Sequence, residues 1–220
     1  MNSLVLPEMP ARIARLPRDR RGYPVPWFVH WTKDGRSSKP GEGEPDFRVI
    51  APSKFSTAYV SCMCWICGGP LGRHKIYVVG PMCVVSRTTN EPASHRECAE
   101  FAAAACPFLT NPRQKRDGKN LPANRFVADG AIDRNAGAVA LYETRFVEPF
   151  RAGRGVLFRL GLPERIDWYA EGRAATAREV EDSISSGYPF LVREAAKCGQ
   201  EALAALPQQL ADAMMLLPAT

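Results

Sequence analysis

The chain has only three histidines in 220 residues, and this scarcity restricts the catalysis open to it. Imidazole is the side chain best suited to acid–base chemistry near neutral pH. The sequence also lacks a phosphate-binding glycine loop ending in Gly-Lys-Ser or Gly-Lys-Thr, a Gly-x-Ser-x-Gly nucleophile elbow and a His-Glu-x-x-His helix. These absences exclude the enzyme classes built on those motifs and favour a protein that is not an enzyme.

Long apolar runs are absent too. No stretch approaches the roughly 20 apolar residues that a membrane-spanning helix requires, and the N-terminus has no recognisable secretory signal. The cysteine count is seven, an odd number that argues against a disulfide framework. With 45% hydrophobic and 24% charged residues, the composition is that of a globular domain. We therefore expect a soluble cytoplasmic protein with no membrane partner, in a compartment where thiols stay reduced.

Four possible metal ligands occur as two tight pairs, Cys64-x2-Cys67 and His95-x2-Cys98, with 27 residues between the pairs. Two ligands separated by two residues can bind one tetrahedral Zn²⁺ from a single backbone turn, and two such pairs complete a closed shell of the structural type. After the first pair, Gly68 can adopt the positive φ that lets backbone amides fold back toward a thiolate. The sequence therefore predicts one structural zinc ion held by Cys64, Cys67, His95 and Cys98.

The other cysteines have different expected roles. Cys62 lies two residues before Cys64 and is an alternative ligand, although the x2 spacing favours Cys64. Cys83, Cys106 and Cys198 are expected to pack as small hydrophobic residues. Basic side chains beside the ligand pairs are candidate hydrogen-bond donors to the thiolates, namely Arg73, Lys75 and Arg96.

The segments between and after the ligand pairs predict a hairpin and a helix. Residues 74–79 and 82–85 are mostly apolar and β-branched, and Gly80-Pro81 separates them as a turn would. Ser94 and Glu97 have capping-box spacing, which would place His95 at the first helical position. The helix would turn Phe101, Ala102 and Ala105 toward a core and end before Pro107.

A cysteine pair, a hairpin and a helix whose first turn holds the second pair together resemble a treble-clef zinc finger across residues 62–106. The resemblance implies the fold and the same four ligands. It implies little about function, because treble clefs occur in ribosomal proteins, nucleases, nucleic-acid readers and ubiquitin-system domains. We expect an α+β fold in which a treble-clef-like zinc finger is inserted between antiparallel β-strands and is followed by a C-terminal helical segment.

The flanking segments predict further strands. Residues 27–31 and 46–50 suggest a hairpin with a long loop, and Pro52-Ser53 opens a short helix. Residues 138–146, 156–160 and 165–169 are typical of three strands, with a glycine-rich turn at 152–155 between the first two. Together with the N-terminal pair, these strands would form one antiparallel sheet.

The C-terminal part predicts three helices. Thr176 and Glu179 form a second capping box, and Gly187 with Pro189 would stop that first helix. A second helix is expected at 189–197 and a third at 203–217. The chain is thereby divided into a basic N-terminal arm (1–22), a β-hairpin with a short helix (23–61), the treble-clef-like finger (62–108), a basic loop (109–137), antiparallel strands (138–170) and C-terminal helices (171–220).

Positive charge is concentrated in the first part of the chain. The net charge is +6, and residues 161–220 contain five basic against nine acidic side chains, so this segment carries −4 and residues 1–160 carry +10. Five arginines lie in the N-terminal arm, and a second basic group follows the finger. Basic flexible segments bind phosphates because each neutralised phosphate releases counterions. We therefore predict a non-enzymatic zinc module that binds nucleic acid, with phosphate contacts from Arg113, Lys115, Arg116 and Lys119.

Two other functions stay open at this point. One is a protein-binding adaptor or inhibitor of a host enzyme that uses the acidic tail and the cysteine pair. The other is an HNH-like metal-dependent nuclease with His74 as the base and carboxylates from Asp129, Asp133 or Glu143. The nuclease pattern is incomplete, because its helical metal ligand falls inside the Cys3His set. Trp65 would either stack on a base or pack over the metal site, and packing is favoured.

Several stretches also resemble a group of uncharacterised proteins encoded by tailed phages, prophages and bacterial genomes. They include Pro-Ala-Arg-Ile-Ala-Arg-Leu-Pro, Asp-Phe-Arg-Val-Ile and Ser-His-Arg-Glu-Cys-Ala, and they fall within residues 10–110. The resemblance implies a bacterial or phage-infected cytoplasm and a host or phage protein as a possible partner. It implies no particular activity.

Overall fold

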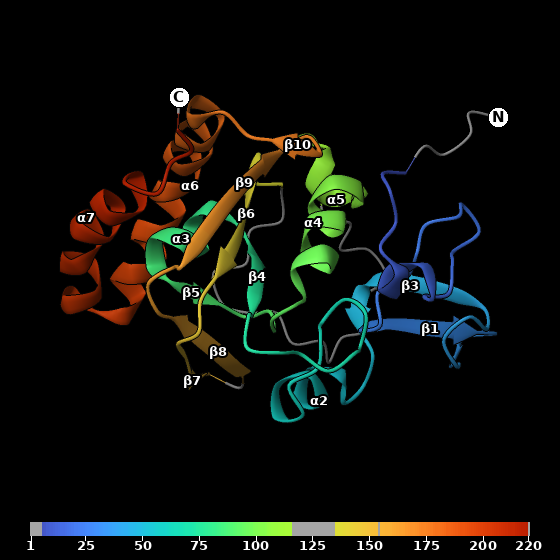
Figure 1. Cartoon of the computed structure of the whole chain (residues 1–220). Helices are drawn as coiled ribbons and strands as arrows, with labels where there is room; N and C mark the ends of the chain where they lie inside the picture. The colour runs from blue at the N-terminus through green and yellow to red at the C-terminus, as the bar shows by residue number, and fades with distance from the viewer. Residues whose placement is uncertain (1–5, 116–134, 154, 220) are drawn as a thin grey trace.

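The computed structural model describes residues 6–115, 135–153 and 155–219, and these residues form a mixed α+β structure with antiparallel sheets and C-terminal helices (Figure 1). The described strands belong to three separate sheets. A single sheet was predicted, and that prediction is wrong. Within the described residues, no helix is both long enough and apolar enough to cross a lipid bilayer.

The N-terminal sheet has the order β2-β1-β3. It consists of β1 (Val29–Lys33), β2 (Arg36–Ser37) and β3 (Glu44–Ile50), and β1 and β3 pair antiparallel as the hairpin prediction requires. Helix α2 (Lys54–Val60) follows and confirms the short helix predicted after Pro52-Ser53. This sheet has a small core of its own, formed by Val25, Val29 and Trp31.

The central sheet has the order β10-β9-β6-β4. Its strands are β4 (Ile76–Val79), β6 (Ala138–Glu143), β9 (Arg165–Ala170) and β10 (Arg173–Ala174). Every residue of β6 is buried, because helices cover both faces of the sheet. Val139 and Leu141 pack toward α4 (Arg96–Ala105), whereas Ala140 and Tyr142 pack with the helices on the opposite face. The alternation of side chains along a strand produces these two cores.

The third sheet has the order β5-β8-β7 and comprises β5 (Thr88–Thr89), β7 (Val147–Ala152) and β8 (Gly155–Leu160). The predicted strand 138–146 is therefore too long, because β6 ends at Glu143 and the chain turns before β7. Buried Thr144 stabilises this turn through hydrogen bonds with the backbone of Phe146. The turn sends the next hairpin into a different sheet.

The predicted hairpin of residues 74–85 is wrong. Strand β4 pairs with β6, and the following segment is the helix α3 (Pro81–Ser86). Pro81 occupies the first turn of that helix, where its missing N–H costs nothing. Val84 and Val85 are buried against the C-terminal helices, and a short β-branched run of this kind does not distinguish a strand from a buried helix. The hairpin of a treble clef is therefore not present in this segment.

Helix α4 ends at Ala105 with Cys106 as its C-cap, and α5 (Pro107–Thr110) follows, which confirms the stop at Pro107. The start of α4 differs from the prediction. His95 is the N-cap and Ser94 makes no side-chain cap, since Ser94 is buried and exchanges backbone hydrogen bonds with Ile76. Glu97 contacts Arg12 instead of the N-cap backbone.

The C-terminal helices are α6 (Ala177–Cys198) and α7 (Gln200–Met214), and both lie on α3 (Figure 1). The capping box of Thr176 and Glu179 is confirmed. The predicted stop at Gly187 and Pro189 is wrong, because α6 continues through both residues. Gly187 lies so close to Met82 that a Cβ would come within 2.9 Å of Met82 Cγ, and this packing keeps the helix in place despite the hydrogen bond that Pro189 removes.

The first testable prediction concerns this capping box. Hydrogen bonds from Arg173 and from the backbone N–H of Thr176 lower the pKa of Glu179 to about 2, from an ordinary value of 4.5. A folded-state pKa below the unfolded value stabilises the fold above the unfolded pKa, and the contribution disappears as the pH falls toward the folded pKa. Wild type should exceed Glu179→Gln in free energy of unfolding by up to about 1 kcal/mol at neutral pH.

This difference should shrink as the pH falls from 4.5 toward 2, when measured by urea unfolding at several pH values. Glu181→Gln, an exposed substitution on the same helix, is the matched control. A difference between wild type and Glu179→Gln that stays constant over this pH range would contradict the assignment.

Candidate metal centre

The structure brings the four predicted metal ligands together. The ligand atoms of Cys64, Cys67, His95 and Cys98 all lie within 4.8 Å of one another. His95 Nδ1 is 3.4 Å from Cys67 Sγ and 3.8 Å from Cys98 Sγ. Tetrahedral Zn²⁺ with bonds of about 2.3 Å to sulfur and about 2.0 Å to nitrogen separates such atoms by about 3.5 Å. The spacing is therefore that of ligands around one tetrahedral ion, and the group could hold a metal ion such as zinc.

Backbone N–H groups point at the sulfur atoms. The N–H groups of Cys67 and His95 donate to Cys64 Sγ, and that of Gly69 donates to Cys67 Sγ, each at 3.4 Å. Gly68 has a φ of +71°, as predicted, and a Cβ there would lie 2.5 Å from the Trp27 ring. Only glycine therefore fits the turn that aims these amides at the thiolates.

The orientation of His95 is fixed by its second ring nitrogen. Nε2 lies 2.9 Å from the carbonyl oxygen of Pro70. A carbonyl only accepts hydrogen bonds, so Nε2 carries the proton and the lone pair of Nδ1 faces the sulfur atoms. A ligating histidine usually donates its other N–H in this way. His95 is therefore set up as an Nδ1 ligand.

The three thiols cannot all ionise without a cation. Hydrogen bonds from Cys67 and Cys98, and from backbone N–H groups, hold the pKa of Cys64 far below its ordinary value. The resulting thiolate raises the pKa of Cys67 and of Cys98, because it accepts hydrogen bonds from their thiols and repels a second negative charge. A divalent cation among the sulfur atoms would replace those protons. The three sulfur atoms thus form one coupled group whose negative charge a cation could neutralise.

The N-terminal segment covers this centre. Helix α1 (Ala11–Ala14) carries Ile13, which is 1% exposed and packs with Cys64, Cys98 and Phe101. Next to it, Arg12 forms an ion pair with Glu97 at 2.9 Å between largely exposed side chains, which contributes little stability. The predicted flexible arm is therefore wrong for this part of the chain, because apolar burial holds it on the metal centre.

The remaining cysteines lie outside the group. Cys62 is exposed and is not among the clustered ligands in the described residues, so the structure selects Cys64 over it. Cys83 packs against the main core, and burial raises its pKa to about 11. Cys106 is half-buried. Cys198 is exposed at the end of α6, which contradicts its expected packing role.

The predicted nucleic-acid residues are less fully placed. Arg113 and Lys115 are exposed after α5, whereas Arg116 and Lys119 lie outside the described residues. Trp65 is only 4% exposed and stacks on Phe28, with ring centroids 4.4 Å apart. It therefore packs in the interior and is not available to stack on a base.

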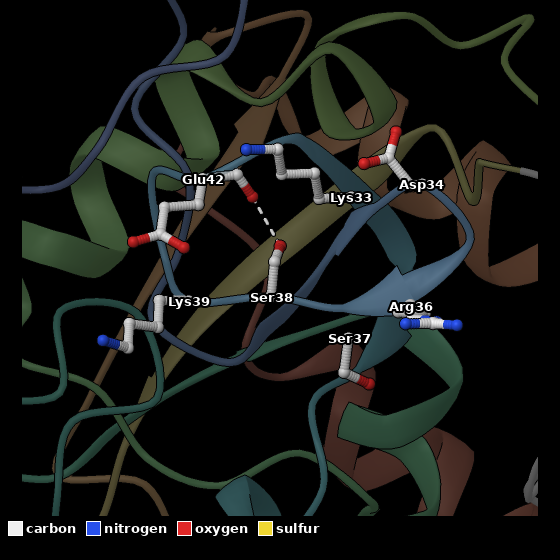
Figure 2. Close-up of a pocket in the computed structure, with 7 residues that line it drawn as sticks. All are labelled: Lys33, Asp34, Arg36, Ser37, Ser38, Lys39 and Glu42. Carbon is white, nitrogen blue, oxygen red and sulfur yellow. Dashed lines mark hydrogen bonds between the residues drawn. The ribbon is translucent and has the colours of Figure 1, made fainter.

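A hollow beside the β1–β2 turn is not part of the metal centre. Figure 2 shows the side chains around it, and Ser38 Oγ donates to the carbonyl oxygen of Glu42 across it. Three cations line this hollow, namely Lys33, Arg36 and Lys39. Two carboxylates, Asp34 and Glu42, and the hydroxyls of Ser37 and Ser38 complete the lining. The opposing charges largely balance, so the hollow itself selects no anionic ligand.

One group of charged residues was predicted only in part, since the nuclease alternative named His74 and Glu143. Arg96, expected to donate to the thiolates, forms ion pairs with Glu143 and Asp167. His74 Nδ1 lies 2.6 Å from Glu143 Oε1. These residues are far apart in the sequence and meet through the packing of α4 on the central sheet and the pairing of its strands, so no local spacing could signal the contacts. The other carboxylates considered for His74, Asp129 and Asp133, lie outside the described residues.

The second prediction compares the metal content of a variant at a proposed ligand, Cys98, with that of a variant at Cys62, which lies outside the group. Cys98→Ser should lose the tightly bound equivalent of metal that copurifies with the chain, because the group loses a thiolate, whereas Cys62→Ser should retain it. Metal content is measured by elemental analysis together with thermal unfolding. A chelator should lower the Tm of wild type and of Cys62→Ser but not that of Cys98→Ser, because metal at 100 times its Kd contributes about 2.7 kcal/mol. Equal metal content in wild type and Cys98→Ser would contradict the assignment.

Comparison with known proteins gives no family for this chain. No protein-family model, no curated protein and no solved structure matches it. The resemblance to phage and prophage proteins stays a prediction. The functional conclusions therefore depend on the geometry and chemistry of the residues themselves.

Proposed function

We propose that this chain is a non-enzymatic zinc protein that binds nucleic acid through its basic segments. Three thiols and one imidazole form a soft ligand set that suits tetrahedral Zn²⁺ better than Mg²⁺, Ca²⁺ or Mn²⁺. Cys64 and Cys98 are completely buried, and the four ligands leave no open coordination position. Zinc of this kind is structural, and here it would join α1, the cysteine turn and α4.

The observation that carries the nucleic-acid proposal is the difference in charge pairing along the chain. In the C-terminal half, arginines such as Arg145, Arg159 and Arg173 each contact a carboxylate. By contrast, in the described part of the chain no carboxylate pairs with the exposed side chains of Arg15, Arg20, Arg113 and Lys115.

Unpaired cations are the ones available to phosphates. Each phosphate that they neutralise releases counterions, so binding would be strongly salt-dependent and only weakly dependent on sequence. The metal centre contributes by anchoring the N-terminal segment, which bears Arg15 and Arg20. The basic segment that begins at Arg113 directly follows α5, and α5 follows α4, which carries Cys98.

One observation favours a second candidate function, that of a protein-binding adaptor. Phe146 and Leu162 are 76% and 68% exposed, and they lie on neighbouring turns, since the N–H of Gly161 donates to the carbonyl oxygen of Phe146 at 2.8 Å. Exposed apolar neighbours of this kind are found in interaction surfaces. An adaptor would retain its partner after nuclease treatment of the cell extract, and a nucleic-acid binder would not.

The third prediction tests the nucleic-acid proposal. Replacing Arg113, Lys115, Arg116 and Lys119 together by alanine should weaken binding to a fluorescent duplex or single strand. It should also reduce the slope of log K against log salt by about 0.9 for each duplex phosphate that the variant no longer neutralises. Fluorescence anisotropy at several salt concentrations measures both quantities.

The control removes exposed positive charge from the acidic half of the chain. Arg178→Ala with Arg193→Ala should leave the affinity and the slope close to wild type, since both side chains are exposed on α6. Equal salt slopes for wild type and the fourfold variant would contradict the role of the basic segment.

A further inference from the structure

We propose that His74, Glu143 and Glu164 form a second divalent-metal site, with different ligands from the Cys3His group and open to solvent. Their ligand atoms all lie within 4.8 Å of one another. The donor set is one imidazole and two carboxylates, which suits first-row divalent ions such as Zn²⁺, Co²⁺ and Mn²⁺. This site goes beyond the proposed function and does not depend on it.

The register of the central sheet places these residues at one end of three strands. Glu143 is the last residue of β6 and lies opposite Ile76 on β4 and Arg165 on β9. His74 precedes β4 by two residues, and Glu164 precedes β9 by one. The backbone N–H of Glu164 donates to the carbonyl oxygen of Glu143 at 2.8 Å. Strand pairing therefore fixes Glu143, a backbone hydrogen bond holds Glu164 beside it, and His74 lies at the entry to the paired strand β4, which favours a preorganised site.

An arginine contacts each of the two carboxylates. Arg96 contacts Glu143 Oε2, so Oε1 is the oxygen that faces His74 Nδ1 at 2.6 Å. Arg145 Nε contacts Glu164 Oε1 at 2.8 Å. Outer contacts of this kind orient ligating carboxylates in metal sites. Glu143 is only 8% exposed, and the hydrogen bonds from Arg96 and His74 outweigh its burial and lower its pKa, so it is present as a carboxylate.

A divalent ion would take the place of the direct contact between His74 Nδ1 and Glu143 Oε1. It would accept the Nδ1 lone pair and one oxygen from each carboxylate, and any proton on Nδ1 would pass to water. The side chains of His74 and Glu164 are 65% and 37% exposed. Three protein ligands on an exposed edge leave coordination positions for water or an anion. A metal ion bound in this way can exchange with solvent, unlike the ion of a closed structural site.

The test is isothermal titration calorimetry of the full, reduced, metal-free chain with Zn²⁺. Wild type should bind one equivalent tightly at the Cys3His group and a second equivalent more weakly. His74→Asn and Glu164→Gln should each weaken the second event at least about tenfold and leave the first unchanged. Both substitutions are at exposed positions, and circular dichroism will verify that the variants are folded. His30→Asn, a histidine on β1, is the matched control and should retain both events.

This experiment can refute the assignment of each metal site independently of the other. Loss of the tight event in Cys98→Ser, with the weaker event retained, would support both assignments. A wild type that binds a single equivalent, which His74→Asn does not weaken, would overturn the second site and leave the first intact. A second event that persists unchanged in both His74→Asn and Glu164→Gln would also overturn it.

Discussion

The backbone of Ile76 connects the parts of this molecule that carry chemistry. On one side its N–H and C=O groups bond to Ser94, the residue immediately before the ligand His95. On the other side it lies in register with Glu143 at the end of β6. Because peptide groups buried in this way must be paired, the strand fixes both the start of α4 and the end of the central sheet. The Cys3His group and the His74 cluster therefore depend on the same short strand.

This arrangement explains how two short ligand pairs become one group that could hold a metal ion. Each pair is preorganised locally, the first by the glycine turn after Cys67 and the second by the N-terminus of α4. The backbone hydrogen bond from Trp65 N–H to the carbonyl oxygen of Ala93, together with that from His95 N–H to Cys64 Sγ, then brings the two local units next to each other. Helix α1 closes the centre from outside with Ile13, so the metal-binding group is also part of a hydrophobic core. Metal binding and folding are coupled in such a site.

Charge is organised on a larger scale than the individual sites. The central sheet and the C-terminal half pair most of their arginines with carboxylates, as Arg96 does with Glu143 and Asp167. The N-terminal segment and the segment at Arg113 leave cations unpaired in the described residues. The first pattern stabilises positions within the fold, and the second leaves charge available for a polyanion. The proposed nucleic-acid surface and the proposed second metal site follow from these two different uses of arginine.

The sequence by itself determined the local features of this protein. The x2 spacing identified Cys64, Cys67, His95 and Cys98, the position of Gly68 identified the turn, and Thr176 with Glu179 identified the start of α6, because each of these signals is complete within a few residues. Tertiary structure decided the rest. Val84 and Val85 became helical because their side chains are buried against the C-terminal helices, and α6 passed through Pro189 because its packing on α3 outweighs the one hydrogen bond that proline removes. His74, Glu143 and Glu164 met only through strand register, and contacts across such distances leave no periodic pattern in the chain.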